Sequence, residues 1–132
     1  MPTIVRRSHP TIIETRREIF QAVGWQVRSS VWSPPTDVYE TEDWFIVRVE
    51  VAGLQDDDIE VAIENNVLTV SGHRSDFNER RAYLQMEIRF GKFEIAIEIP
   101  VAVEIEQAIA EYKEGFLIVQ LPKASPKHIE VE

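Results

Sequence analysis

Alternation of apolar and polar residues is the strongest pattern in this chain, and it is clearest near the middle. Ile59, Val61 and Ile63 alternate with charged or small residues, which is the period of a strand with one buried face. Asn65-Asn66 follows, and asparagine tolerates the positive φ angles of a two-residue hairpin turn. The next five residues are mostly β-branched or apolar, and Gly72 closes the run. The pattern predicts a β-hairpin.

A second stretch, residues 105–121, repeats this plan. It begins with Ile105-Glu106, turns through Lys113-Glu114-Gly115 and returns through the apolar residues 116–119. Two hairpins that each carry one apolar face cannot stay apart in water, so we expect them to pack face to face as a β-sandwich.

Other segments with a strand pattern complete this all-β picture. Two prolines precede the first of them, which suits an edge strand. A charged, irregular stretch at 73–90 precedes the last of them and contains one short candidate strand. Seven or eight short strands at this spacing predict an antiparallel sandwich rather than βαβ units. The further strands are expected at residues 36–39, 44–51, 82–86 and 93–99.

The residues before Pro34-Pro35 follow a different pattern, so we take this pair as a domain boundary and residues 1–33 as an arm. Thr11 and Glu14 have the spacing of a capping box and Gly24 suits a helix end, which predicts a short helix at 12–23. Trp25 and Trp32 are costly to leave in water. One possibility is that they pack on their own domain. The other is that they pack between subunits or against unfolded proteins.

Composition and charge narrow the function. The chain has 132 residues, no cysteine and a net charge of −9, which argues against a nucleic-acid-binding surface. Five arginines and two acidic residues fall in the arm, so the arm is basic and the remainder strongly acidic. No apolar run is long enough for a membrane span or a signal peptide core. We expect a soluble, cytoplasmic domain.

The sequence contains little evidence of a catalytic or metal-binding site. The three histidines, His9, His73 and His128, fall in different predicted loops or tails and lack a metal-ligand spacing. The acidic run at residues 56–58 lacks the alternating ligands of an EF-hand loop and reads as a solvated turn. No nucleophile elbow, zinc helix or phosphate-binding loop occurs. We expect no enzyme activity, cofactor or bound metal.

Several motifs now combine. Residues 49–74, VEVAGLQDDDIEVAIENNVLTVSGHR, and PPTDVYETEDWFIVRVEVAG before them resemble the α-crystallin domain of the small heat-shock proteins. The A-x-x-x-x-G-x-L pattern of that family is matched by Ala110, Gly115 and Leu117, and its tail motif I-x-I/V by Ile129 and Val131. The resemblance covers residues 34–132.

The resemblance implies an immunoglobulin-like sandwich at 34–123, a tail at 124–132, and an ATP-independent chaperone that prevents aggregation of partly unfolded proteins under heat or other stress. It also implies a dimer, in which residues 82–86 in a loop pair with the partner's edge strand at 36–39. The residues of this exchange are Ala82, Tyr83, Leu84, Met86, Val38 and Tyr39.

Higher assembly would use the tail. By the same resemblance, Ile129 and Val131 insert into a groove of another dimer, and larger homo-oligomers result. The groove residues are Ile59, Val61, Ile63, Ile105 and Ile109. Clients would bind apolar residues of the arm, for which the candidates are Ile12, Ile13, Ile19, Phe20, Val23, Trp25 and Trp32.

The chain departs from the family at two positions. Ile95 stands where the family usually has an arginine, and Ile88 replaces the arginine of an E-R-x-x-G-x-F motif. An apolar contact would then replace an ion pair at the dimer interface.

Two other functions remain open at this stage. One is a p23-like co-chaperone, or a β-sandwich module with one defined partner, which the Ile129/Val131 tail and the 73–90 loop disfavour. The other is a sugar-binding sandwich that stacks exposed tryptophans on its ligand. Trp25, Trp32 and Trp44 form no obvious platform for it.

Overall fold

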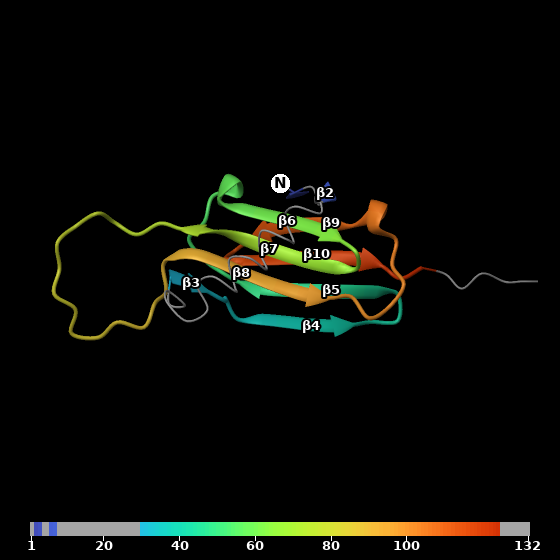
Figure 1. Ribbon diagram of the computed structural model, residues 1–132, viewed down its shortest axis with the longest axis horizontal. Coiled ribbons are helices and arrows are strands. Elements are labelled where there is room, and N and C mark those ends of the chain that lie inside the picture. Colours follow the sequence, from blue (N-terminus) through green and yellow to red (C-terminus); the bar gives the residue numbers. More distant parts are fainter. Residues whose placement is uncertain (1, 4–5, 8–29, 125–132) are drawn as a thin grey trace, which may run out of the picture.

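Two five-stranded sheets pack face to face in the computed structural model, which describes residues 2–3, 6–7 and 30–124 (Figure 1). This confirms the predicted all-β sandwich. The first sheet runs in the order β1 (Pro2–Thr3), β9 (Ile109–Lys113), β10 (Phe116–Pro122), β5 (Trp44–Glu50), β4 (Thr36–Glu40). The second runs in the order β2 (Arg6–Arg7), β6 (Ile59–Glu64), β7 (Val67–Arg74), β8 (Gly91–Glu98), β3 (Val31–Trp32).

The two predicted hairpins form and fall in opposite sheets. Asn65 and Asn66 adopt φ angles of 52° and 61°, so the β6–β7 turn uses the left-handed conformation that asparagine tolerates. Glu114 and Gly115, with φ angles of 53° and 83°, make the equivalent turn between β9 and β10. The apolar faces of the hairpins therefore meet in the middle of the sandwich.

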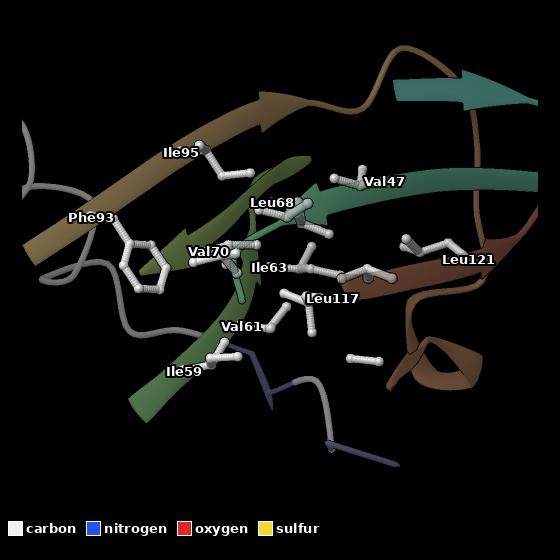
Figure 2. Close-up of a cluster of buried hydrophobic side chains, with 14 of the residues drawn as sticks. Val47, Ile59, Val61, Ile63, Leu68, Val70, Phe93, Ile95, Leu117 and Leu121 are labelled. Atoms are coloured by element: carbon white, nitrogen blue, oxygen red, sulfur yellow. The ribbon is translucent and has the colours of Figure 1, made fainter. Parts of the chain in front are cut away.

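Inward-facing residues of both sheets form one core. Val47, Val49 and Val119 are fully buried, as alternation along β5 and β10 predicts. Figure 2 shows the side chains of β6 pointing into the same cluster as Leu117 of β10. Each such side chain contributes about 1.5–3 kcal/mol relative to an exposed one. The core therefore fixes the register of every long strand.

Three details of the sequence prediction are wrong. Ile105 lies in a 3₁₀ turn, η3 (Ile105–Gln107), and not in a strand. Strand β7 does not close at Gly72 but continues to Arg74, because Gly72 pairs with both Ile59 and Phe93. Residues 82–86 form no strand, since residues 75–90 extend away from the sandwich and meet no sheet edge of their own chain (Figure 1).

Short strands before Thr36 were not predicted from the sequence. Strand β1 pairs with β9, and β2 and β3 add parallel strands to β6 and β8. All three precede Pro34-Pro35, so the sheets include six residues that the sequence assigned to the arm. A second 3₁₀ turn, η2 (Asp56–Asp58), holds the acidic run, and Asp58 accepts a hydrogen bond from the Gln55 amide at 2.9 Å.

Gly72 lies where no side chain fits. A Cβ atom at this position would sit 2.1 Å from the Asp58 carbonyl oxygen and 2.6 Å from Cζ of Phe93. We expect Gly72→Ala to lower the free energy of unfolding by about 1–3 kcal/mol because backbone and core must shift. Denaturant unfolding measures this change. The matched control is the neighbouring Ser71→Ala, for which we expect a change within about 0.5 kcal/mol; equal effects would contradict the steric argument.

Candidate functional site

The outer edge of β4 is one of two surfaces that the sequence proposed for dimer formation. Val38 and Tyr39 are 43% and 40% exposed. The ladder to β5 is bounded by the bonds Glu50 N–H to Pro35 and Thr41 N–H to Trp44. Antiparallel pairing alternates, so Val38 directs its N–H and C=O away from β5. Within the described residues, β4 ends its sheet and these groups face outward.

Polar contacts on β4 keep the strand in place. Arg48 of β5 donates to Asp37 at 2.6 Å, which raises the pKa of the guanidinium, and its Cζ atom lies 5.8 Å from the centre of the Tyr39 ring. Lys123 pairs with Glu40 at 2.7 Å. Both ion pairs are partly exposed and stabilise the fold little. They leave the outer backbone edge free to accept another strand.

The second proposed surface is the loop at residues 75–90, which projects from one end of the sandwich (Figure 1). Leu84 is fully exposed and Phe77 is 82% exposed. A contiguous apolar surface of this kind is unusual on a protein that stays alone. The exposed large apolar residues of the loop are Phe77, Tyr83, Leu84, Met86, Ile88 and Phe90.

Arg81 makes several polar contacts within the loop. Its guanidinium pairs with Asp76 at 3.2 Å and Glu79 at 3.1 Å, and it donates to the Tyr83 hydroxyl at 2.9 Å. These contacts join residues five apart or closer. They shape the loop locally but attach it to nothing in the sandwich.

Arg74 attaches the loop to the sandwich, a role that no pattern in the sequence indicates. Its guanidinium lies 4.5 Å from the centre of the Trp32 ring and 5.3 Å from that of Phe90. It donates to the carbonyl oxygen of Arg89 at 2.9 and 2.5 Å and to that of Ala52 at 3.2 Å. Arg74 thus joins both ends of the loop to β3 and to the β5–β6 connection.

A cleft of about 880 Å³ lies beside this clamp. The loop residues Phe77, Ile88 and Phe90 contribute to one side, and Gly115 and Phe116 of the β9–β10 turn contribute to its lining. Charged residues complete the lining, namely Glu50, Arg74, Asp76, Glu87, Arg89 and Glu114. The cleft is therefore mixed in character, with apolar rings beside ionic groups.

The residues predicted to form the groove for the tail are not arranged as expected. Ile59, Val61 and Ile63 point inward from β6 and are 7%, 2% and 1% exposed (Figure 2). Ile109 is 46% exposed, whereas Ile105 lies half-buried in η3. The edges of β6 and β9 carry β2 and β1. The chain's own N-terminal residues therefore take the place expected for a tail.

The residues proposed for client binding and for the tail fall into two groups. Trp32 is buried at 6% exposure, and its ring centre lies 5.6 Å from that of Phe93 with the ring planes tilted by 58°, so it packs on its own domain and offers no client surface here. Ile129 and Val131 of the tail, the helix at 12–23 and the other arm candidates lie outside the described residues. Those arm candidates are Ile12, Ile13, Ile19, Phe20, Val23 and Trp25.

The motif residues prove to be structural. Ala110 and Leu117 are fully buried, and Gly115 has a positive φ angle and accepts a hydrogen bond from the Val51 amide at 2.8 Å. Ile95 is buried in the core of its own chain, so it replaces no interface ion pair. Ile88 is 65% exposed in the loop and can meet a partner.

Two other kinds of feature are absent from the described residues. No group of three histidine, aspartate or glutamate side chains is placed to hold a metal ion. No helix within these residues has the length and apolar character needed to cross a membrane.

Comparison with known proteins agrees with this architecture. Residues 37–132 match the model of the Hsp20/alpha crystallin family. The chain is 32% identical over 97 residues to small heat shock protein C4 of Rickettsia felis, covering 72% of this chain and 60% of that protein. It is 38% identical over 96 residues to the 17.7 kDa class II heat shock protein of Arabidopsis thaliana, covering 70% of this chain and 62% of that protein.

Among solved structures, heat shock protein 16.0 from Schizosaccharomyces pombe superimposes with a TM-score of 0.63 at 30% identity, covering 76% of this chain and 98% of that one. The fold and its motifs define an α-crystallin-type sandwich. The chain belongs to the Hsp20/alpha crystallin family. The match spans about 60% of the length of the curated relatives named above.

The Arg74 clamp can be tested directly. Arg74→Met keeps the stem but removes the donors and the cation, so we expect amide exchange at residues 87–92 to rise several-fold. Hydrogen exchange followed by mass spectrometry measures it. Arg48→Met, which removes an arginine far from the loop, is the matched control. Unchanged exchange in Arg74→Met would show that the loop root is held by other contacts.

Proposed function

We propose that this protein is an ATP-independent chaperone that binds partly unfolded proteins and keeps them from aggregating. The observation that carries the proposal is the apolar loop at 75–90, which stands away from a stable sandwich of the Hsp20/alpha crystallin family. Apolar surface of this extent stays soluble only when another protein covers it for much of the time. The occupants we propose are a second subunit and unfolded clients.

A dimer formed by exchange of loops fits both proposed surfaces. The loop has apolar side chains at Leu84 and Met86, two positions apart, which lie on one face when the segment is extended. The edge of β4 offers outward backbone groups and the exposed Val38 and Tyr39. Strand addition there would satisfy the backbone of residues 82–86, which pairs with no strand among residues 2–3, 6–7 and 30–124.

Higher assembly and client capture then follow from many weak contacts. Tails that carry Ile129 and Val131 would dock on other dimers, and several docking events act together in one assembly. Heating weakens each contact and frees apolar surface for a client. The net charge of −9 would keep the loaded complexes dispersed.

Light scattering from a heat-labile client, without ATP, tests the function. We expect suppression at a near-stoichiometric ratio of subunits to client. The comparison variant carries Ile129→Ala and Val131→Ala, and we expect it to have a smaller native mass because its tail has lost both apolar anchors. No suppression by the folded wild-type chain would reject the holdase function, and an unchanged mass of the variant would reject tail docking.

The exchanged dimer is tested at Val38. Val38→Pro removes an outward N–H while leaving the β4–β5 ladder intact, because edge strands tolerate proline where the N–H faces solvent. We expect the dimer dissociation constant to rise about tenfold, the effect of one lost hydrogen bond at a buried edge. Sedimentation measures it, with Val38→Thr as the control that retains the N–H. Equal dissociation constants would place the dimer contact elsewhere.

A further inference from the structure

Strands β2 and β3 lie at opposite edges of the second sheet and run in the same direction. β2 is parallel to β6, β3 is parallel to β8, and β6 and β8 are both antiparallel to β7. Parallel strands of one sheet need a crossover connection of a dozen or more residues, because the chain must return to the end of the sheet from which it started. The connection between β2 and β3 is residues 8–29, which lie outside the described residues. It has to pass over one face of the sheet.

The inner face of this sheet is closed to the connection. Buried side chains of β6, β7 and β8 pack there against the first sheet (Figure 2), so the crossover must use the outer face. The register sets its two ends. Arg7 lies opposite Ile63 and hence level with Ile97, whereas Val31 lies opposite Lys92, five residues back along β8. The path is therefore a diagonal from the β6 side to the β8 side, about 19 Å across the strands and about 17 Å along them.

Burial on the outer face follows this diagonal. The side chains that alternate with the core residues face outward, and two of them, Ala62 and Thr69, are only 3% and 6% exposed. The core cluster includes neither of them. Oε1 of Glu94, further along the diagonal on β8, is also buried. Glu60 and Glu98 lie on the same face but off the path, and both are exposed. Short side chains shield one another little, so this burial indicates a cover over the diagonal.

The sequence of the connection suits this cover. The helix predicted at 12–23 would be about 18 Å long, which matches most of the diagonal. Ile12, Ile19 and Val23 have the spacing of one helix face, and Arg16 falls in the middle of the same face. A buried carboxylate is stable when it is paired with a cation. Arg16 is the one basic residue of the predicted helix that would face the sheet, so it is the partner we expect for Glu94.

We propose that residues 12–23 form a helix that crosses the outer face of the β6–β7–β8 sheet, with Arg16 paired to Glu94. The apolar side chains of the helix would lie on a row of short residues that are directly opposite one another on adjacent strands. This row is Ala62, Thr69 and Ala96. Glutamates flank the row on both sides, which favours a segment that carries arginines. These contacts lie within one subunit, and they hold whether or not the protein is a chaperone.

A single thiol reports whether this face is covered. The chain has no cysteine, so Thr69→Cys introduces one reactive group at the centre of the proposed contact. His73→Cys is the matched control, because His73 lies on the same face of the same strand but beyond the diagonal, and it is exposed. The rate of maleimide labelling of the native full-length chain, divided by the rate in denaturant, measures access to each thiol. We expect this ratio to be at least about tenfold lower for Thr69→Cys.

Charge reversal identifies the segment that covers the thiol. In the Thr69→Cys chain, Arg16→Glu should raise the labelling rate several-fold, because it places a second carboxylate beside Glu94. Adding Glu94→Arg to that variant should restore the protection, because the two charges are then exchanged. Arg17→Glu makes the same change of charge on another side of the predicted helix, and we expect it to leave the labelling rate unchanged.

Three results would contradict these contacts. Equal labelling ratios for Thr69→Cys and His73→Cys would show that the outer face is open. Protection that survives both Arg16→Glu and the pair Ile19→Asp with Val23→Asp would assign the cover to residues other than 12–23. Protection that is lost when the protein is diluted to single subunits would assign the cover to the arm of a second copy and overturn the crossover within one chain.

Discussion

Unpaired backbone groups at sheet edges are the constraint on which the rest of this structure depends. A sandwich is not a closed barrel, so each of its sheets ends in strands with outward N–H and C=O groups. Three of the four edges carry short strands from the first 32 residues, namely β1, β2 and β3. The remaining edge, β4, is longer and has exposed apolar side chains. Among the described residues, β4 is therefore the one long strand that ends a sheet.

The loop at 75–90 is the second surface of the structure that is open to a partner. Its arginine, aspartate and glutamate side chains make it soluble, but its apolar side chains are exposed and pack in no core. Arg74 fixes the root of this loop by stacking between Trp32 and Phe90. Because Trp32 belongs to β3, the residues that follow the arm and the root of the loop share one cluster. A displacement of β3 would therefore change the contacts of the loop root, and the reverse.

Charge separates the parts of the chain by role. The sandwich and tail hold most of the 23 acidic residues, while five of the 14 basic residues fall in the arm. An acidic sandwich repels its copies at a distance and attracts its own basic N-terminus nearby. Short-range apolar contacts must then overcome repulsion for assembly, which makes each contact weak and reversible. Weak, reversible contacts of this kind fit the chaperone function that we propose.

The long strands could be read from the sequence because their causes are local. Alternation along β5, β6 and β8 records which side chains face the core, and Asn65-Asn66 and Gly115 record where the backbone needs a positive φ angle. Spacing of the motif residues Ala110, Gly115 and Leu117 was also sufficient to indicate the family. Their roles in core and turn follow from the same local rules.

Tertiary structure decided the remainder. Strands β1, β2 and β3 have only two residues each, too few for any periodicity, and exist because a long strand offers them an edge. In the sequence, Arg74 is one more charged residue in an irregular stretch. Its role depends on Trp32, 42 positions away, whose ring lies against the guanidinium in the folded chain. Sequence by itself determined which faces are buried. Only the folded chain decided which edges are occupied, because an edge is satisfied by backbone groups, and backbone groups are the same in every residue except proline.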